Sequence, residues 1–270
     1  APEQTKESAT EETESTTETE SETPTETETE SETETEETTE EETEGPGDPV
    51  DREKVETHLI IASDTHYMSP SMTDYGAAFD SLVNSNDGKV IRYQPQLWQA
   101  FKSEVLAANP DALILSGDLS LNGEKANHLE FSEKLHEIEE AGVPVYVIPG
   151  NHDINKPDAG EYFGDQRTDV ESVTSEEFRE IYADFGYNEA KSGAPDSLSY
   201  LVELNDTTWL MMLDTTVCEP ENEVYGEIKE GTLEWMEECL KEAYAEGITV
   251  IPVGHHNLQR LSRVYVEECV

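Results

Sequence analysis

Four short stretches of this 270-residue chain combine residue types that can bind metal ions. They are Asp64-Thr65-His66, Gly117-Asp118, Gly150-Asn151-His152-Asp153 and His255-His256. Carboxylate, imidazole and amide groups together suit divalent Mn, Fe or Zn. A structural zinc site would instead use cysteine thiolates, and the three cysteines show no Cys-x-x-Cys spacing. The four stretches therefore predict a site for divalent ions.

Each of these stretches follows an apolar run of strand length. The runs cover residues 58–62, 112–115, 143–148 and 248–253. Apolar residues recur at helical spacing before the second run, before the third and before the fourth. The alternation of strand, helix and strand predicts a layered α/β domain with parallel strands. Ligands of such sheets bind beyond the carboxyl ends of the strands, so the polar side chains are expected at one edge.

The order of the four stretches resembles the calcineurin-like metallophosphoesterases. Their pattern runs Asp-x-His, Gly-Asp, Gly-Asn-His-Asp/Glu and a later His, and all four blocks occur here in order. Gly-Asn-His-Asp is the specific block, because chance would supply only about 0.001 copies in a chain of this kind. The resemblance covers residues 57 to about 257 and looks closest to bacterial members similar to cyclic-nucleotide phosphodiesterases. It implies two stacked β-sheets flanked by helices, an αββα sandwich.

The resemblance also implies an activity and a role for each residue. A hydroxide bridging two divalent metal ions (Mn, Fe or Zn) would attack the phosphorus of a phosphomonoester or phosphodiester. The metal ligands would be Asp64, His66, Asp118, Asn151 and His255, with Asp118 bridging both ions. His256 stays an alternative to His255, since the two are neighbours. His152 would protonate or hydrogen-bond the leaving oxygen, and Asp153 would orient its ring.

The sequence departs from the family pattern after the fourth block. The closing Gly-His-x-His block gives one histidine to each metal in the family, but no histidine follows His256 here. We therefore expect residues 51–270 to be a C-terminally truncated metallophosphoesterase domain with impaired activity. The alternative is a catalytically inactive surface binding or scaffolding protein that keeps the fold.

The first 50 residues differ in composition from the rest. They hold 19 Glu and 15 Thr but only three hydrophobic residues. Such a segment cannot bury enough apolar surface to fold, so a disordered acidic stalk or linker is predicted. Thr/Glu repeats of this kind resemble the stalks of bacterial extracytoplasmic enzymes. We expect a secreted or cell-surface protein, with a cytoplasmic protein carrying an acidic tail as the alternative.

The formal net charge of -47 limits the partners of the chain. An acidic surface repels phosphate, so general electrostatics would not bind nucleic acid or an anionic membrane. No apolar run approaches the roughly 18 residues of a membrane-spanning helix. A phosphate-ester substrate is still compatible with this charge, because bound metal ions dominate the local field.

Other polar residues are expected to be structural. His128 and His136 lie among Glu and Lys in the predicted helix 124–141, where they are expected to be solvated. Asp214 ends a predicted strand and is expected in a turn. The sequence specifies neither the substrate nor the oligomeric state.

Overall fold

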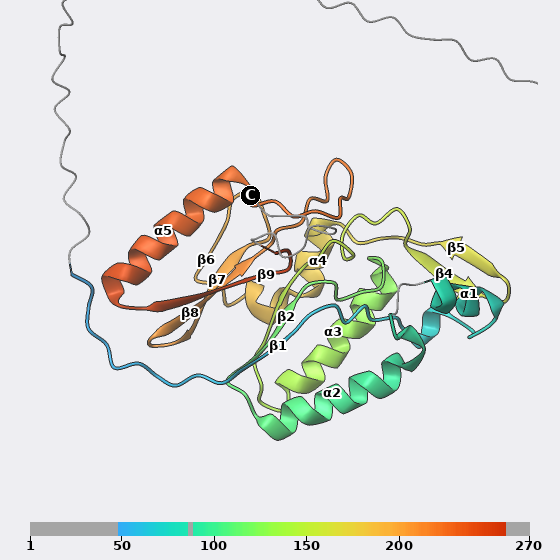
Figure 1. The fold of residues 1–270 in the computed structure, drawn as a ribbon, viewed down its shortest axis with the longest axis horizontal. Coiled ribbons are helices and arrows are strands. Elements are labelled where there is room, and N and C mark those ends of the chain that lie inside the picture. The colour runs from blue at the N-terminus through green and yellow to red at the C-terminus, as the bar shows by residue number, and fades with distance from the viewer. Residues whose placement is uncertain (1–47, 86–88, 258–270) are drawn as a thin grey trace, which may run out of the picture. The chain divides into compact units, whose positions relative to one another are not determined.

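The computed structural model of the chain describes residues 48–85 and 89–257 (Figure 1). The predicted disorder of residues 1–50 falls almost wholly outside the described residues, so it stays a prediction. The described part is a mixed α/β structure with several sheets, and the predicted α/β class is confirmed. None of its helices combines the length and the apolar character needed to cross a bilayer.

The first sheet contains three parallel strands in the order β1-β2-β3, as the alternation of elements predicted. The strands are β1 (Leu59–Ala62), β2 (Ala112–Ser116) and β3 (Val145–Ile148). Helix α2 (Gln94–Ala108) leads into β2, and α3 (Lys125–Glu139) leads into β3. Every residue of β2 and β3 is buried, which is usual where helices cover a parallel sheet.

The second sheet has four strands in the order β6-β7-β8-β9. They are β6 (Ser192–Gly193), β7 (Tyr200–Asn205), β8 (Thr208–Leu213) and β9 (Thr249–Gly254). β7 and β8 form an antiparallel hairpin, whereas β9 runs parallel to β8 after helix α5 (Glu230–Glu246). Side chains of both sheets meet in the largest core cluster, where Ile114 and Val147 join Leu210 and Met212.

Shorter elements fill the segments that the sequence pattern left unplaced. They are the 3-10 turns Pro70–Met72 and Ile91–Tyr93, α1 (Ala77–Ser85), β4 (Gly160–Phe163), β5 (Gln166–Asp169), α4 (Ser175–Ile181) and the π-turn Ala183–Tyr187. β4 and β5 pair as a hairpin. A small separate core holds α1 against this hairpin through Phe79 and Tyr162. In Figure 1, α1 and the β4-β5 hairpin lie at one end of the view, whereas α4 lies near its middle.

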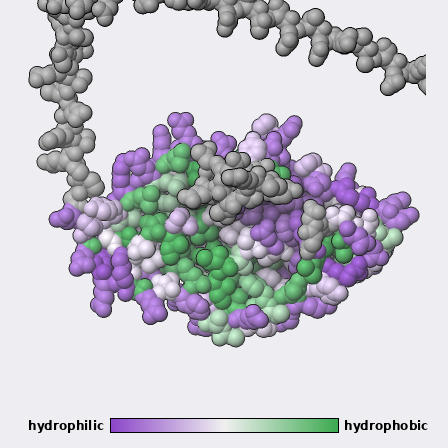
Figure 2. Space-filling model, in the orientation of Figure 1, coloured by the Kyte–Doolittle hydropathy of each residue, from purple (hydrophilic) through white to green (hydrophobic). Residues whose placement is uncertain are grey.

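In the described part of the chain each sheet has an unpaired edge strand, and apolar side chains are exposed on β1 and on helix α5. In the described residues β1 pairs only with β2, and β9 pairs only with β8. Ile61 of β1 is 57% exposed, and Leu233 and Leu240 of α5 are also exposed. Figure 2 shows a broad patch of hydrophobic residues on the face in view. Unpaired edges with apolar neighbours favour association between chains, so limited solubility is expected.

Glu139 at the end of α3 gives a prediction for the pH dependence of stability. Burial, with smaller contributions from the charges of Glu189 and Asp184, raises its pKa to about 7. Because the pKa is higher in the folded state than its ordinary 4.5, the protonated side chain contributes stability that is lost as pH rises through 7. Glu139→Gln stays neutral at every pH. We expect this variant to be more stable than wild type at pH 8 by about 1 kcal/mol and equally stable at pH 4. Urea denaturation at both pH values measures this, and a pH-independent difference would contradict it.

Candidate metal centre

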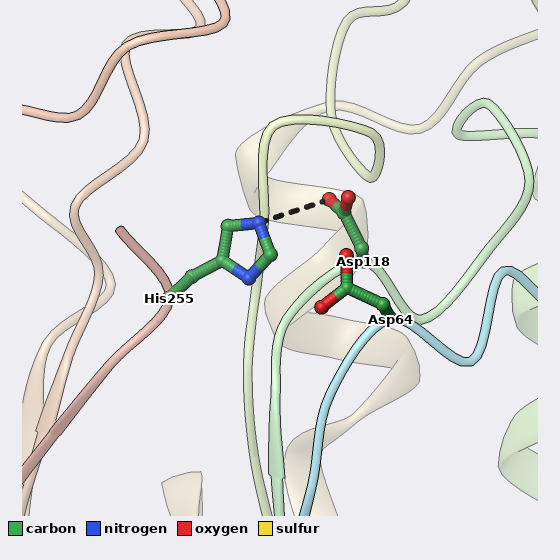
Figure 3. A group of neighbouring side chains, drawn as sticks. All are labelled: Asp64, Asp118 and His255. Carbon is green, nitrogen blue, oxygen red and sulfur yellow. Dashed lines mark ion pairs between the residues drawn. The ribbon is translucent and has the colours of Figure 1, made fainter. Parts of the chain in front are cut away.

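The carboxyl ends of four strands meet at the site, as the sequence predicted. Asp64 lies two residues after β1, and Asp118 lies two residues after β2. Asn151 follows β3, and His255 comes directly after β9 of the second sheet. Figure 3 shows Asp64, Asp118 and His255 directed toward one another. The structure therefore assembles the site from both sheets.

Sharp backbone turns direct the two aspartates into the site. Asp64, His66 and Asp118 have φ angles of 56°, 40° and 52°, in the left-handed region that residues other than glycine rarely adopt. Two backbone hydrogen bonds hold these turns together. The Asp64 amide donates to the Gly117 carbonyl at 3.1 Å, and the His66 amide donates to the Asp118 carbonyl at 2.9 Å. Strain of this kind is frequent at functional sites, where the surrounding structure maintains it.

The five predicted metal ligands lie together. The ligand atoms of Asp64, Asp118 and His255 are all within 4.8 Å of one another. His255 Nε2 lies 3.4 Å from Asp118 Oδ1 and 3.3 Å from Asn151 Oδ1. His66 Nε2 lies 3.5 Å from Asp118 Oδ2 and 3.6 Å from Asp64 Oδ1. Asp118 thus presents one carboxylate oxygen to each histidine.

The hydrogen bonding of His255 suits a metal ligand. Its Nδ1–H donates to the Ser116 carbonyl at 2.8 Å, so Nε2 carries a lone pair when the ring is neutral. This lone pair faces the carboxylate oxygen of Asp118 and the amide oxygen of Asn151. Nε2 lies close to both oxygens, and a positive charge there, either a proton on Nε2 or a bound metal ion, offsets the repulsion among the three atoms. A carbonyl that accepts from the far ring nitrogen is also the usual support of a metal-binding histidine.

The charges of the site lead to the same conclusion. Asp118 is buried, and burial together with the nearby charge of Asp153 raises its pKa. The imidazole of His66 beside the more exposed Asp64 holds the pKa of that carboxyl below its usual range. Among the ion pairs formed by residues 48–85 and 89–257, no lysine or arginine pairs with either aspartate. In addition, His66 Nδ1 is buried and has no hydrogen-bond partner in the described part.

His152 is held beside the ligands in one orientation. Its Nδ1 lies 2.8 Å from Asn122 Oδ1 and 3.0 Å from the Leu121 carbonyl oxygen. Both partners accept hydrogen bonds, so Nδ1 carries the proton and Nε2 is the free nitrogen. The ring meets His66 edge-on, with 4.9 Å between the ring centroids. Asn122 was not expected to have this role.

The predicted contact between Asp153 and the His152 ring is wrong. The Asp153 carboxylate accepts the backbone N–H groups of Leu119 at 3.0 Å, Ser120 at 2.8 Å and Gly150 at 2.9 Å. These bonds join the loops that follow β2 and β3. Asp153 therefore stabilises the backbone that carries the ligands, and Asn122 takes the orienting position.

His128 and His256 lie outside the cluster of predicted ligands. His128, expected to be solvated, is fully buried, with Nε2 3.0 Å from the Asp153 carbonyl oxygen and Nδ1 2.8 Å from the Tyr182 hydroxyl. The sequence interpretation was wrong because His128 lies on the inner face of α3. The His256 ring contacts the Thr215 hydroxyl and the Val224 carbonyl instead of the ligand cluster. Of the two neighbouring histidines, His255 is the one that faces Asp118.

A cavity opens beside the ligand cluster. Its volume is about 650 Å³, and Asp64 and His66 form part of its wall. Trp98 and Phe101 of α2 contribute an apolar side, and Lys89 contributes an ammonium group. This space could admit a substrate of moderate size next to the ligands.

Comparisons with known proteins agree with this geometry. Residues 57–269 match the family model described as calcineurin-like phosphoesterase. A comparison with curated proteins gave no match. The matched segment begins just before β1 and includes every residue of the candidate metal centre.

Proposed function

Since the chain belongs to the calcineurin-like phosphoesterase family, we propose that it is a metal-dependent hydrolase of phosphoric esters. The observation that carries the proposal is the position of His255 Nε2, which lies 3.4 Å from Asp118 Oδ1 and 3.3 Å from Asn151 Oδ1. Two divalent ions, Mn, Fe or Zn, would occupy the centre. The substrate would be a phosphomonoester or phosphodiester. The αββα sandwich and the branch resembling bacterial cyclic-nucleotide phosphodiesterases are parts of the same proposal.

The ligands divide into two groups around Asp118. Asp64 and His66 would hold one ion, while Asn151 and His255 would hold the other. Asp118 would contact both ions, because its two oxygens face the two histidines separately. Bound divalent ions supply acidified water and neutralise charge on phosphoryl oxygens.

His152 would act on the leaving oxygen through its free Nε2. Burial, with smaller contributions from the charges of Lys89, His66 and Lys156, lowers the pKa of His152 to about 4. The ring is therefore neutral at pH 7, with an unprotonated Nε2 that accepts a hydrogen bond. An anionic ester beside the ring would raise this pKa, because negative charge favours the imidazolium. Protonated at Nε2, His152 could then donate to the leaving oxygen.

His152→Gln tests the proposed role in hydrolysis. We expect kcat on 4-nitrophenyl phosphate with added Mn²⁺ to fall by about 10²- to 10⁴-fold, the usual contribution of a positioned acid or base. Mn²⁺ affinity, measured by calorimetry, should change little, because His152 is not one of the predicted ligands. His136→Gln on α3 is the matched control and should retain full activity.

Two outcomes would contradict the proposal. Unchanged turnover in His152→Gln would contradict the proposed action of this histidine on the leaving oxygen. The proposed phosphoesterase activity would be contradicted if the wild-type chain bound Mn²⁺, Fe²⁺ or Zn²⁺ but hydrolysed neither nitrophenyl monoesters nor diesters.

We also propose that the protein acts outside the cytoplasm. The support is the composition of residues 1–50, with 19 Glu and 15 Thr. Such a segment suits an extended spacer that holds a domain away from a surface. Cell fractionation with an antibody to the folded domain tests this location, and recovery in the cytoplasmic fraction alone would reject it.

A further inference from the structure

The cavity beside the candidate metal centre has a polar side and an apolar side. On the polar side, Asp64 and His66 are predicted metal ligands, and Lys89 adds an ammonium group. The apolar side consists of Val90 and of three residues of helix α2, namely Leu97, Trp98 and Phe101. A ligand that fills this cavity therefore contacts metal ligands at one end and apolar side chains at the other.

Helix α2 fixes the apolar side relative to the metal ligands. Gln94 Nε2, in the first turn of α2, donates to the Thr65 carbonyl at 2.7 Å and to the His66 carbonyl at 3.2 Å. Leu97, Trp98 and Phe101 follow Gln94 by three, four and seven residues, so they lie on the same face of the helix. We call these three residues the α2 row. At 1.5 Å per residue, the row reaches about 10 Å along the helix from the bonded turn, about the length of a two-ring aromatic group.

Much of this apolar surface is open to solvent. Leu97 is 48% exposed and Val90 is 54% exposed, while Phe101 is half-buried. Ala62 of the neighbouring strand β1 lines the same cavity, and within the described residues β1 pairs with β2 alone. A ligand that covered these side chains would gain free energy, because apolar surface would leave water. The cavity thus favours a ligand that carries an apolar group.

We propose that the α2 row and Val90 bind the apolar alcohol group of the phosphate ester. The cavity is continuous with the metal ligands Asp64 and His66, which a substrate must reach and which a covering protein segment would obstruct. The inference rests on the proposed function and narrows its substrate class to esters of apolar alcohols about the size of one or two rings. A small polar alcohol such as glycerol would leave the α2 row in contact with water.

Two phosphate monoesters with Mn²⁺ test the role of the α2 row, with release of inorganic phosphate as the readout. They are 2-naphthyl phosphate and glycerol 2-phosphate. We expect Leu97→Asn to lower kcat/KM for the naphthyl ester about five- to tenfold and for the glycerol ester less than about twofold, because only the naphthyl group covers Leu97. Val90→Asn, on the same apolar side, should show the same preference.

Two control variants separate apolar contact from an effect on the fold. Leu97→Met keeps an apolar side chain of similar volume and should stay within about twofold of wild type for both esters. Leu240→Asn makes the same replacement at a leucine of α5 that is 46% exposed and outside the cavity, and it should also leave both esters unaffected.

Three outcomes would overturn the inference. Equal losses for both esters in Leu97→Asn would mean that Leu97 acts through the fold or holds another part of the chain. No loss with either ester would remove the contact with the alcohol. Wild-type self-association that Leu97→Asn abolishes in sedimentation, with the preference between esters unchanged, would assign the α2 row to a contact between copies.

Equilibrium binding separates this inference from the proposed function. Calorimetric titration of the Mn²⁺-loaded protein with 2-naphthylphosphonate and with methylphosphonate compares the two groups without turnover. We expect the naphthyl compound to bind wild type about tenfold more tightly, and Leu97→Asn to lose most of that difference. If wild type hydrolyses no ester, the proposed function fails and the titrations decide alone. Equal affinities for the two phosphonates, or no binding of either, would overturn the role of the α2 row.

Discussion

Asp118→Asn is expected to abolish hydrolysis and to weaken metal binding in the same protein. The side chain is buried and directs its two oxygens at His66 and His255 separately. Asparagine keeps one oxygen, places an N–H₂ donor at the other position and carries no charge. The loss of metal affinity should exceed the roughly 10- to 100-fold that follows changes in groups that only support ligands. Mn²⁺ calorimetry and nitrophenyl phosphate hydrolysis measure the two effects.

The same substitution should have the opposite effect on the metal-free protein. Burial raises the pKa of Asp118, which means that the ionised carboxylate is costly at pH 8 without a cation. Asparagine removes that cost, so in EDTA the variant should be more stable than wild type toward urea. Addition of Mn²⁺ should stabilise wild type and leave the variant unchanged.

Asp214→Asn is the matched control for loss of a buried carboxylate. Asp214 follows β8 and accepts the backbone N–H groups of Leu198 and Thr216, each at 2.9 Å. The replacement should lower thermal stability but leave the Mn²⁺ affinity of the folded protein unchanged. If both Asn variants lost metal affinity equally, Asp118 would act through the fold and not as a ligand.

Gly117→Ala is expected to be the most damaging single methyl addition near the site. Gly117 has a φ angle of 94°, and an added Cβ would lie 2.7 Å from His255 Nδ1 and 2.9 Å from the Gly150 Cα. The left-handed backbone alone costs about 1 to 2 kcal/mol for alanine. The overlap adds about 1 to 3 kcal/mol and should displace His255 from Asp118. We therefore expect both a loss of unfolding free energy and weaker Mn²⁺ binding.

Gly142→Ala separates the backbone strain from the overlap. Gly142 has nearly the same φ angle, 97°, but no atom lies within 4 Å of its added Cβ. Its replacement should cost only the backbone contribution, about 1 to 2 kcal/mol, and should leave Mn²⁺ binding intact. Equal stabilities of the two variants in urea would contradict the role assigned to the close approach of Gly117 and His255.

Strands β2 and β3 were predictable from sequence because they are buried on both sides. The run 112–115 reads as continuous apolar residues since helices cover β2. The predicted ends of strands and helices differ from the observed ones by one or two residues, because the apolar pattern extends beyond the hydrogen-bonded element. The run 143–148 begins two residues before β3, and the predicted helix 124–141 exceeds α3 at both ends.

The grouping of the predicted ligands could be inferred from sequence because each of them follows a recognisable strand. Asp153 shows the limit of that reasoning, since adjacency to His152 in the chain does not give contact in space. In the turn after β3 the two side chains diverge, and the Asp153 carboxylate binds backbone amides. Lys89 had no such signal, because it is a single polar residue in a segment without periodicity. Asn122 belongs to the stretch Asn122-Gly123-Glu124, which also resembles the family, but the resemblance did not predict its contact with His152.

The meeting of Ser116 and His255 has a consequence for the order of assembly. These residues are separated by 139 positions, yet the His255 ring hydrogen-bonds the Ser116 carbonyl at the edge of the other sheet. An ion held by Asp118 and His255 would act as a cross-link that closes this long loop, and such a bond chiefly restricts the unfolded chain. A growing or partly folded chain lacks the last ligand until β9 has joined the second sheet. Full metal affinity would therefore arise only after both sheets have formed, and ion capture would complete folding instead of initiating it.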